Sequence, residues 1–226
     1  MNIALCLYGE SQCEVEALNR LLNSIQGFAS CDLFIYTWKR SKAEDLFKLK
    51  QYQDICAGTI RLMSIVFAER GVPEIACDFN STKSAKTVNT LHNFYARKLC
   101  CITREMSEAD SGISYDAIVM CQAGICLDRT ITLPKYLGFI KKGYIVLPDN
   151  TYKANYIAME EHFALGSADP MLMYCSVYDF LEEYEQYENS GCEILEGPGE
   201  IMMKHLYTRH MKFGHGNFRS ARLTRA

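Results

Sequence analysis

Three apolar runs of the sequence end in residues that could bind a ligand. If the runs are parallel strands of one open α/β sheet, a ligand binds outside the carboxyl ends of those strands. Hydroxyl, amide and aromatic groups there would border a single crevice, although edge packing is the more common role of any one such aromatic ring. The residues selected by this rule are Tyr8, Gly9, Glu10 and Ser11 after the first run, Thr37, Trp38 and Lys39 after the second, and Cys121, Gln122, Ala123 and Gly124 after the third.

A polar stripe follows one face of a long helix predicted at residues 84–105, with Ser84 as its cap. The stripe residues are spaced by three, four and four, so they share one side of the helix. Such side chains can donate hydrogen bonds to phosphate or sugar oxygens, and a solvated face is an equally good interpretation. The stripe consists of Lys86, Asn89, Asn93 and Arg97, and the opposite side offers Val88, Leu91, Tyr95 and Leu99 to the core.

A sheet is needed to bring these residues together, and the order of the apolar segments predicts one. Residues 3–8 are continuously apolar, as in a strand that is covered on both faces, and Gly9 closes the run. Apolar residues at helical spacing follow in 14–25, and a second buried strand occupies 31–38. A strand, a helix and a second strand in this order form a βαβ unit with a right-handed crossover.

The later segments continue this alternation, and no repeat or linker divides the chain. We therefore predict a single α/β domain, residues 1–226, on a mostly parallel sheet. The predicted strands lie at 60–67, at 117–120 in the centre, at 144–148 and just before Gly166, the predicted helices at 40–57, 170–187 and 200–210, and a loop at 69–84.

Composition and charge limit the classes of partner. The chain has 226 residues, of which 49% are hydrophobic, and its formal net charge is only -3. This balance gives no electrostatic case for nucleic acid or for an anionic membrane. The segment from Arg209 onward is basic and lacks acids, so it could contact phosphates, but such a segment is more often a solvated tail.

The cysteines and apolar stretches point to a reducing cytosol. The eleven cysteines follow no framework spacing, and several lie inside apolar runs, as reduced cysteines do when they act as small buried hydrophobes. The sequence shows no secretory signal peptide and no stretch long enough to be a transmembrane segment. A cytoplasmic location is therefore expected.

Taken in order, the segments resemble small GT-A-type glycosyltransferases. The likeness is to enzymes of bacterial capsule and lipopolysaccharide clusters and to the chlorella-virus capsid glycosyltransferase domain, and it spans nearly the whole chain. It implies a three-layer α/β/α fold with a central, mostly parallel mixed sheet, and transfer of a sugar from a nucleotide-sugar donor to a hydroxyl group of a glycan acceptor. The segments that carry it are IALCLYG, DLFIYTW, NTLHNFYARKLC, YDAIVMCQAGICLD, EHFALGS and EGPGEIMMKHL.

The resemblance also assigns roles to individual residues. It implies a nucleotide against Leu7, Tyr8 and Gly9 and near Thr37 and Trp38. The helix with Asn89, Asn93 and Tyr95 would lie beside the donor pocket, and Gln122 and Gly124 would occupy the usual metal-binding segment. A base is needed if the transfer inverts the sugar configuration. Its candidates are Glu200, Glu161 and Asp149. His162 stands where, in the family, an acidic residue often precedes the Phe-x-x-Gly pattern.

The chain departs from the family pattern at two places. Gln12 stands where an arginine usually follows the first-strand glycine, and the Asp-x-Asp or Arg-x-Asp motif at the end of the central strand is absent. Mn²⁺ or Mg²⁺ binding is therefore in doubt, because these ions need carboxylate oxygens.

Three interpretations of this departure remain open. Asp128 could supply a displaced metal ligand, although such an acid is more often a turn or cap residue. Alternatively, Lys86, Arg97 or the C-terminal arginines neutralise the diphosphate without a metal. In the third interpretation the domain is a catalytically inactive binding or scaffold domain that has kept the fold.

Overall fold

The fold is described from a computed structural model in which residues 1–10, 13–56, 58–69, 85–149, 152–153, 156–157, 161–184 and 198–223 are placed. The helices are α1 (Glu14–Ser24), α2 (Lys42–Ile55), α3 (Ala85–Ser111), α4 (Leu137–Ile140), α5 (Ala168–Cys175) and α7 (Pro198–Thr208), with 3-10 turns at Leu133–Lys135 and Ser176–Phe180. The strands are β1 (Asn2–Tyr8), β2 (Ile25–Gln26), β3 (Ser30–Trp38), β4 (Ile60–Ala68), β5 (Ala117–Gln122), β6 (Ile125–Leu127), β7 (Ile131–Thr132), β8 (Ile145–Leu147), β9 (Tyr152–Lys153), β10 (Tyr156–Ile157), β11 (Phe163–Gly166), β12 (Phe213–His215) and β13 (Ser220–Arg222).

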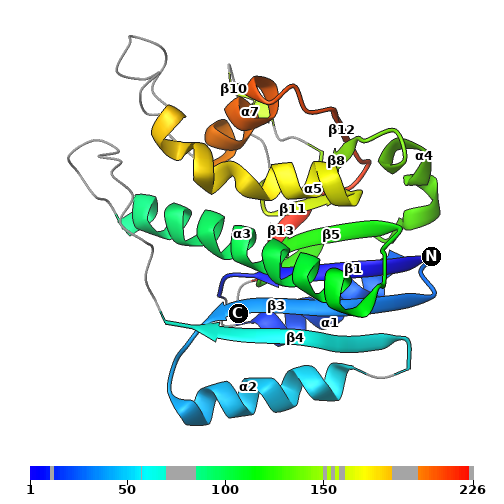
Figure 1. The fold of residues 1–226 in the computed structure, drawn as a ribbon, viewed down its shortest axis with the longest axis vertical. Coiled ribbons are helices and arrows are strands. Elements are labelled where there is room, and N and C mark those ends of the chain that lie inside the picture. The colour runs from blue at the N-terminus through cyan, green and yellow to red at the C-terminus, as the bar shows by residue number, and fades with distance from the viewer. Residues whose placement is uncertain are drawn as a thin grey trace.

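A seven-stranded sheet forms the centre of the protein (Figure 1). Its strand order is β12-β8-β11-β5-β1-β3-β4. Neighbouring strands are parallel, except that β11 runs antiparallel to both β5 and β8. The predicted α/β class with a mostly parallel mixed sheet is confirmed.

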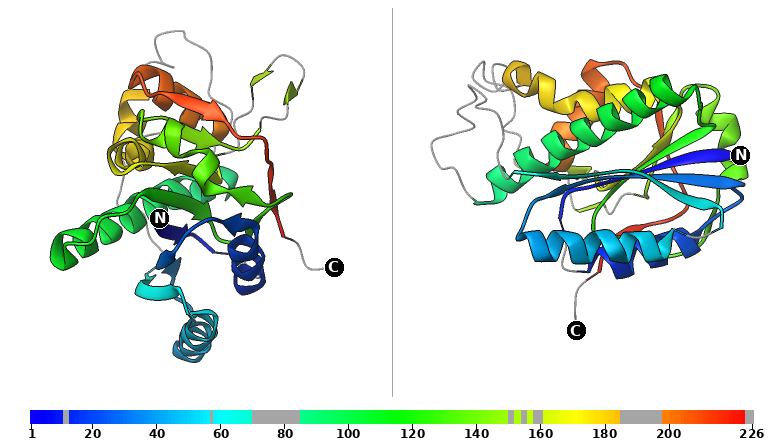
Figure 2. Two further views of the ribbon diagram at one scale, coloured as in Figure 1. Left: turned by 90° about the vertical axis from the view of Figure 1, so that its right-hand side faces the viewer. Right: turned by 60° about the horizontal axis from the view of Figure 1, so that its bottom comes forward.

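Helices cover both faces of this sheet (Figure 2). Helices α1 and α2 lie on one face, and α3, α5 and α7 lie on the other. Alternate residues of β1 therefore enter two different cores, as the two-residue period of a strand requires. Leu5 and Leu7 pack with Leu18 and Leu21 of α1, whereas Cys6 packs on the α3 side. Because both faces are covered, β1 reads as a continuous apolar run.

The strand order reverses at β1. From β1 the chain passes to β3 and β4 on one side, and α3 then returns it to β5 on the other side. In Figure 1 the carboxyl ends of β1, β3 and β5 lie on the left, where α3 begins. Such a reversal leaves a crevice outside the carboxyl ends of the two strands that flank it, here β1 and β5.

The basic C-terminal segment was expected to be a solvated tail, and this prediction is wrong. Residues 213–215 form β12, which pairs in parallel with β8, and residues 220–222 form β13, which pairs with β6. Phe218, between the two strands, is 1% exposed and packs edge-on against Phe163. Residues 213–222 are therefore part of the folded domain, with Phe218 in its core.

Several helix boundaries differ from the predicted ones by two residues or more. Helix α3 continues to Ser111, and α7 begins at Pro198 rather than at residue 200. The predicted helix at 170–187 is a short α5 followed by a 3-10 turn and a helical stretch at 181–184. Ser84, most of the loop at 69–84 and residues 185–187 lie outside the described residues.

Two further sequence expectations can be compared with the structure. None of the helices in the described ranges combines the length and the apolar composition that crossing a bilayer requires. Each cysteine within those ranges is a free thiol, and seven of the nine are buried.

Candidate functional site

Three of the predicted site residues meet at the strand reversal. Gly9 has a left-handed backbone, with φ of +86°, directly after β1. A Cβ atom on Gly9 would lie 3.1 Å from Oδ1 of Asn93 on α3 and 3.6 Å from Cγ of Gln122 at the end of β5. The Gly9 N–H donates to the Tyr36 carbonyl at 3.0 Å, so neighbouring strands hold this turn. A glycine is needed here for both its conformation and its small size.

Gln122 carries an unpaired polar atom into this point. Gln122 is 2% exposed, and its side-chain Oε1 has no hydrogen-bond partner among the described residues. The backbone on both sides is fixed, because the Gln122 N–H donates to the His162 carbonyl and the Ala123 N–H to the Tyr8 carbonyl, each at 2.8 Å. A buried acceptor without a donor costs about 1–3 kcal/mol. A ligand hydroxyl or N–H group that reached this oxygen would remove that cost.

Arg97 lies beneath the same edge and connects three elements. It is 1% exposed, and its Nη2 donates to Tyr8 Oη and to the Glu161 carbonyl, both at 3.0 Å. Its Nη1 lies 3.1 Å from Met202 Sδ of α7. The guanidinium is also 5.1 Å from the ring centre of Tyr8. Arg97 therefore holds the carboxyl end of β1 and the loop before β11 together from inside the core.

This position of Arg97 corrects two expectations. The polar stripe is not a uniform face, because Asn89 is exposed whereas Arg97 is buried deeply in the core on the α3 side. Arg97 is also closed off from a diphosphate, since its Nη atoms are engaged by Tyr8, Glu161 and Met202. Lys86 lies in the first turn of α3, where only the backbone is described.

Glu161 is the candidate base whose neighbour in the chain is hydrogen-bonded to Gln122. It precedes β11, and the neighbouring His162 carbonyl accepts the Gln122 N–H. The Glu161 residue is 7% exposed, and its Oε1 lies 3.4 Å from His162 Nε2. Burial raises the pKa of the Glu161 carboxyl, while the charges of Arg97 and Arg222 oppose this increase. A carboxylate with a raised pKa is a stronger base than an exposed one.

The other two candidate bases lie farther along the fold. Asp149 follows β8, two strands away from β5, and its N–H donates to the Phe218 carbonyl at 2.7 Å. Glu200 is in the first turn of α7, two residues before the Met202 that Arg97 contacts. Of the three acids, Glu161 is therefore the one linked through its neighbour His162 to Gln122.

The remaining predicted residues divide between the two faces of the sheet. Trp38 is on the α3 side, where its ring lies 5.3 Å from that of His92. Leu7 packs against α1 on the opposite face. Thr37 alternates with Trp38, so it faces the α1 and α2 side; it is 1% exposed and its Oγ1 has no partner within the described ranges. Leu7 and Thr37 thus do not share a face with Gln122.

The divalent cation implied by the resemblance does not fit the residues at the end of β5. The Gly124 carbonyl accepts the Leu223 N–H at 2.8 Å. Asp128 Oδ1 accepts the Arg219 N–H at 2.8 Å, and Oδ2 lies 3.5 Å from Arg129, so this acid serves as a turn residue. Within the described ranges no group of three His, Cys, Asp or Glu residues could hold a metal ion.

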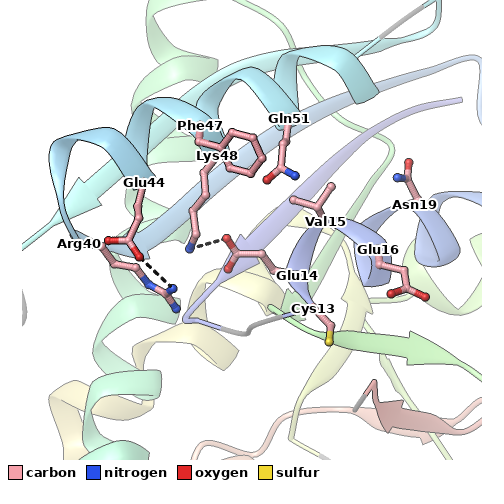
Figure 3. A pocket seen from close by; sticks show the side chains of 10 residues that line it. All are labelled: Cys13, Glu14, Val15, Glu16, Asn19, Arg40, Glu44, Phe47, Lys48 and Gln51. Atoms are coloured by element: carbon pink, nitrogen blue, oxygen red, sulfur yellow. Dashed lines mark ion pairs between the residues drawn. The ribbon is translucent and has the colours of Figure 1, made fainter. Parts of the chain in front are cut away.

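A separate cavity of about 480 Å³ opens between α1 and α2 (Figure 3). The two cations that line it are paired with acids: Lys48 Nζ lies 2.5 Å from Glu14, and Arg40 contacts Glu44 and, outside the lining, Glu10. Both members of the Glu14–Lys48 pair are nearly buried. These cations are therefore already neutralised, and the sequence patterns did not single out this cavity.

No model of a known protein family matches the sequence, and a search of curated proteins finds no similar one.

Proposed function

We propose that the crevice outside β1 and β5 binds a nucleotide-diphosphate sugar, and that the protein transfers the sugar to a hydroxyl group of a glycan acceptor. The mixed sheet, with the antiparallel β11 inserted between β5 and β8, supports a GT-A-like fold. The strand reversal supports the placement of the ligand, because open α/β sheets bind ligands at that point.

The observation that carries this proposal is the buried, unpaired Oε1 of Gln122, a side chain whose Cγ lies 3.6 Å from the position of a Cβ atom on Gly9. An amide oxygen accepts hydrogen bonds, and the ribose and sugar of the donor are rich in hydroxyl donors. The missing Cβ of Gly9 makes room for Asn93, which adds a second amide at the same point. The cluster is neutral and suits polyol recognition.

Glu161 is the proposed base. During direct displacement the acceptor oxygen attacks the anomeric carbon, the bond from that carbon to the diphosphate oxygen breaks, and the hydroxyl proton passes to the Glu161 carboxylate. The leaving electron pair stays on the nucleoside diphosphate. The raised pKa of Glu161 favours its acceptance of this proton.

The substitution Gln122→Met tests the site. Methionine keeps the length of the side chain but removes the amide, so binding of a nucleoside diphosphate is expected to weaken by about tenfold. Fold stability is expected to stay the same or rise, since an unpaired buried oxygen is lost. Isothermal titration with UDP, GDP, ADP and CDP measures binding, and denaturant unfolding measures stability.

Thr37→Val is the matched control. It also removes a buried, unpartnered oxygen at the end of a strand, but on the other face of the sheet. We expect unchanged nucleotide binding in this variant. A wild-type protein that bound none of the nucleotides, with or without Mn²⁺, would contradict the proposed function.

The residues at the end of β5 do not fit a divalent cation, and this favours a second candidate, a nucleotide-binding domain without transferase activity. Glu161→Gln separates the two candidates. If the protein is a transferase, sugar release from the donor is expected to fall at least about a hundredfold in this variant while nucleotide binding persists. Binding without turnover in the wild type would support the second candidate.

A further inference from the structure

The diphosphate of a bound donor needs a positive partner, and most cations near the site are engaged. Arg97 is buried and bonded to Tyr8 and Glu161. Lys48 and Arg40 are paired with acids on the α1 and α2 side. The residues after β5 do not form a carboxylate site for a metal ion. The donor charge must then be met by another group at this edge.

The C-terminal strand brings such a group to the end of β5. β13 pairs antiparallel with β6, and Arg222 stands opposite Ile125, the first residue of β6. The next residue, Leu223, donates its N–H to the Gly124 carbonyl at 2.8 Å. Arg222 is therefore held next to the turn that follows Gln122.

Arg222 is exposed and has no ion-pair partner in the described part of the chain. Its charge acts on Glu161, whose pKa it lowers against the larger effect of burial. The guanidinium thus lies within electrostatic range of the candidate base. A planar guanidinium can hold two phosphate oxygens with parallel hydrogen bonds.

We propose that Arg222 binds the diphosphate of the donor in the place of a divalent cation. This inference rests on the proposed function and specifies how its site neutralises the leaving group. Among the cationic groups that the sequence offered, it selects one of the C-terminal arginines. Donor binding is then independent of added metal.

The test compares wild type, Arg222→Gln and Arg222→Lys in titrations with UDP, GDP, ADP and CDP, each in EDTA and in Mn²⁺. The wild type is expected to bind one of them equally well in both buffers. Arg222→Gln is expected to raise the Kd by at least about tenfold, and Arg222→Lys to restore part of the affinity. The corresponding nucleoside, which lacks phosphates, should show no difference between the variants.

Arg219→Gln is the matched control. Arg219 is also exposed, but it stands beside Asp128 at the far end of β6, and its backbone rather than its side chain holds that turn. Its replacement should leave the Kd unchanged. Thermal unfolding of all variants checks that β13 is still in place.

The outcomes separate this inference from the proposed function. Binding that requires Mn²⁺, or metal-free binding that Arg222→Gln leaves intact, would overturn the role of Arg222 while the function stands. An equal loss of nucleotide affinity in Arg219→Gln and Arg222→Gln would also overturn it, because the effect would then come from the net charge of the protein and not from Arg222 itself. No nucleotide binding in any buffer would overturn both.

Discussion

Gly9 determines how closely the ends of β1, β5 and α3 approach one another. Its φ of +86° is costly for residues with a Cβ atom, by about 1–2 kcal/mol. In addition, that atom would lie 3.1 Å from Asn93 Oδ1. We therefore expect Gly9→Ala to lower the free energy of unfolding by about 1–2 kcal/mol, as measured by denaturant titration.

Gly138 provides the control for this substitution. It lies in α4, its φ is not in the left-handed region, and a Cβ there would meet nothing within 4 Å. Gly138→Ala is expected to be neutral or to stabilise the protein by up to about 1 kcal/mol, because alanine favours a helix. Equal destabilisation by both substitutions would contradict the role assigned to the backbone of Gly9.

The sequence predicted which residues lie at the strand ends, but not which distant side chains contact one another there. Apolar runs with a closing glycine placed Gly9 and Gln122 at one edge of a sheet. The sequence does not reveal that Arg97, in an apparently polar stripe, is buried by contacts with Tyr8, Glu161 and Met202. A buried arginine needs partners from distant segments, and helical spacing carries no information about them.

At the scale of elements, His205 joins α7 to the α5 region. It is fully buried, with Nε2 2.7 Å from the Met173 carbonyl and Nδ1 2.7 Å from Tyr184 Oη. A carbonyl only accepts, so Nε2 carries the hydrogen and Nδ1 accepts from the tyrosine. Burial, with smaller effects from Arg209 and Arg97, lowers the pKa of His205 to about 4 from 6.5. The imidazole is thus neutral in the folded protein at neutral pH.

This neutral histidine predicts a loss of stability in mild acid. Between pH 6.5 and 4 the unfolded chain binds a proton at His205 that the folded chain does not, so the free energy of unfolding decreases as the pH falls through this range. Between pH 7 and pH 5, His205 alone should lower the free energy of unfolding by about 2 kcal/mol. Denaturant unfolding at the two pH values measures it.

The variant His205→Gln isolates this effect. Glutamine can donate to the Met173 carbonyl and accept from Tyr184, but it does not titrate. Between pH 7 and pH 5 the free energy of unfolding of the variant should therefore fall by about 2 kcal/mol less than that of the wild type. The raised pKa of Glu161 acts in the opposite direction, but it is common to both proteins and cancels in the difference. Parallel pH profiles would show that His205 is not held neutral.

The elements themselves were predictable where one segment alone carries the signal. The buried strands β1, β3 and β5 are apolar throughout, and α1 repeats leucines at helical spacing. In contrast, β12 and β13 have three residues each and contain glycine, histidine, serine and arginine. Their structure depends on pairing with β8 and β6, so no local pattern indicates it.

At the scale of the whole molecule, the two cores on either side of the sheet explain why the chain contains so many free cysteines. Cys6 and Cys100 lie in the core beneath α3, and Cys121 lies in the core beneath α1. Each is buried and acts as a small apolar side chain of its core. The sequence shows cysteines inside apolar runs, and the structure shows that their side chains enter both cores, the one beneath α3 and the one beneath α1.

Burial in these cores predicts which thiols react in the folded protein. Cys56 and Cys126 are partly exposed, whereas Cys6, Cys31 and Cys121 are buried, and burial raises the pKa of Cys31 to about 12. Because a thiolate that reaches solvent is the reactive form, maleimide should label Cys126 and Cys56 first among the nine described cysteines, and the buried ones of this set only as the molecule unfolds. Peptide mapping by mass spectrometry follows each site, with guanidinium-unfolded protein as the control in which all thiols react. If Cys6 or Cys121 were labelled as rapidly as Cys126 under native conditions, the two-core arrangement would be wrong, since both cysteines lie on central strands that open only with the whole sheet.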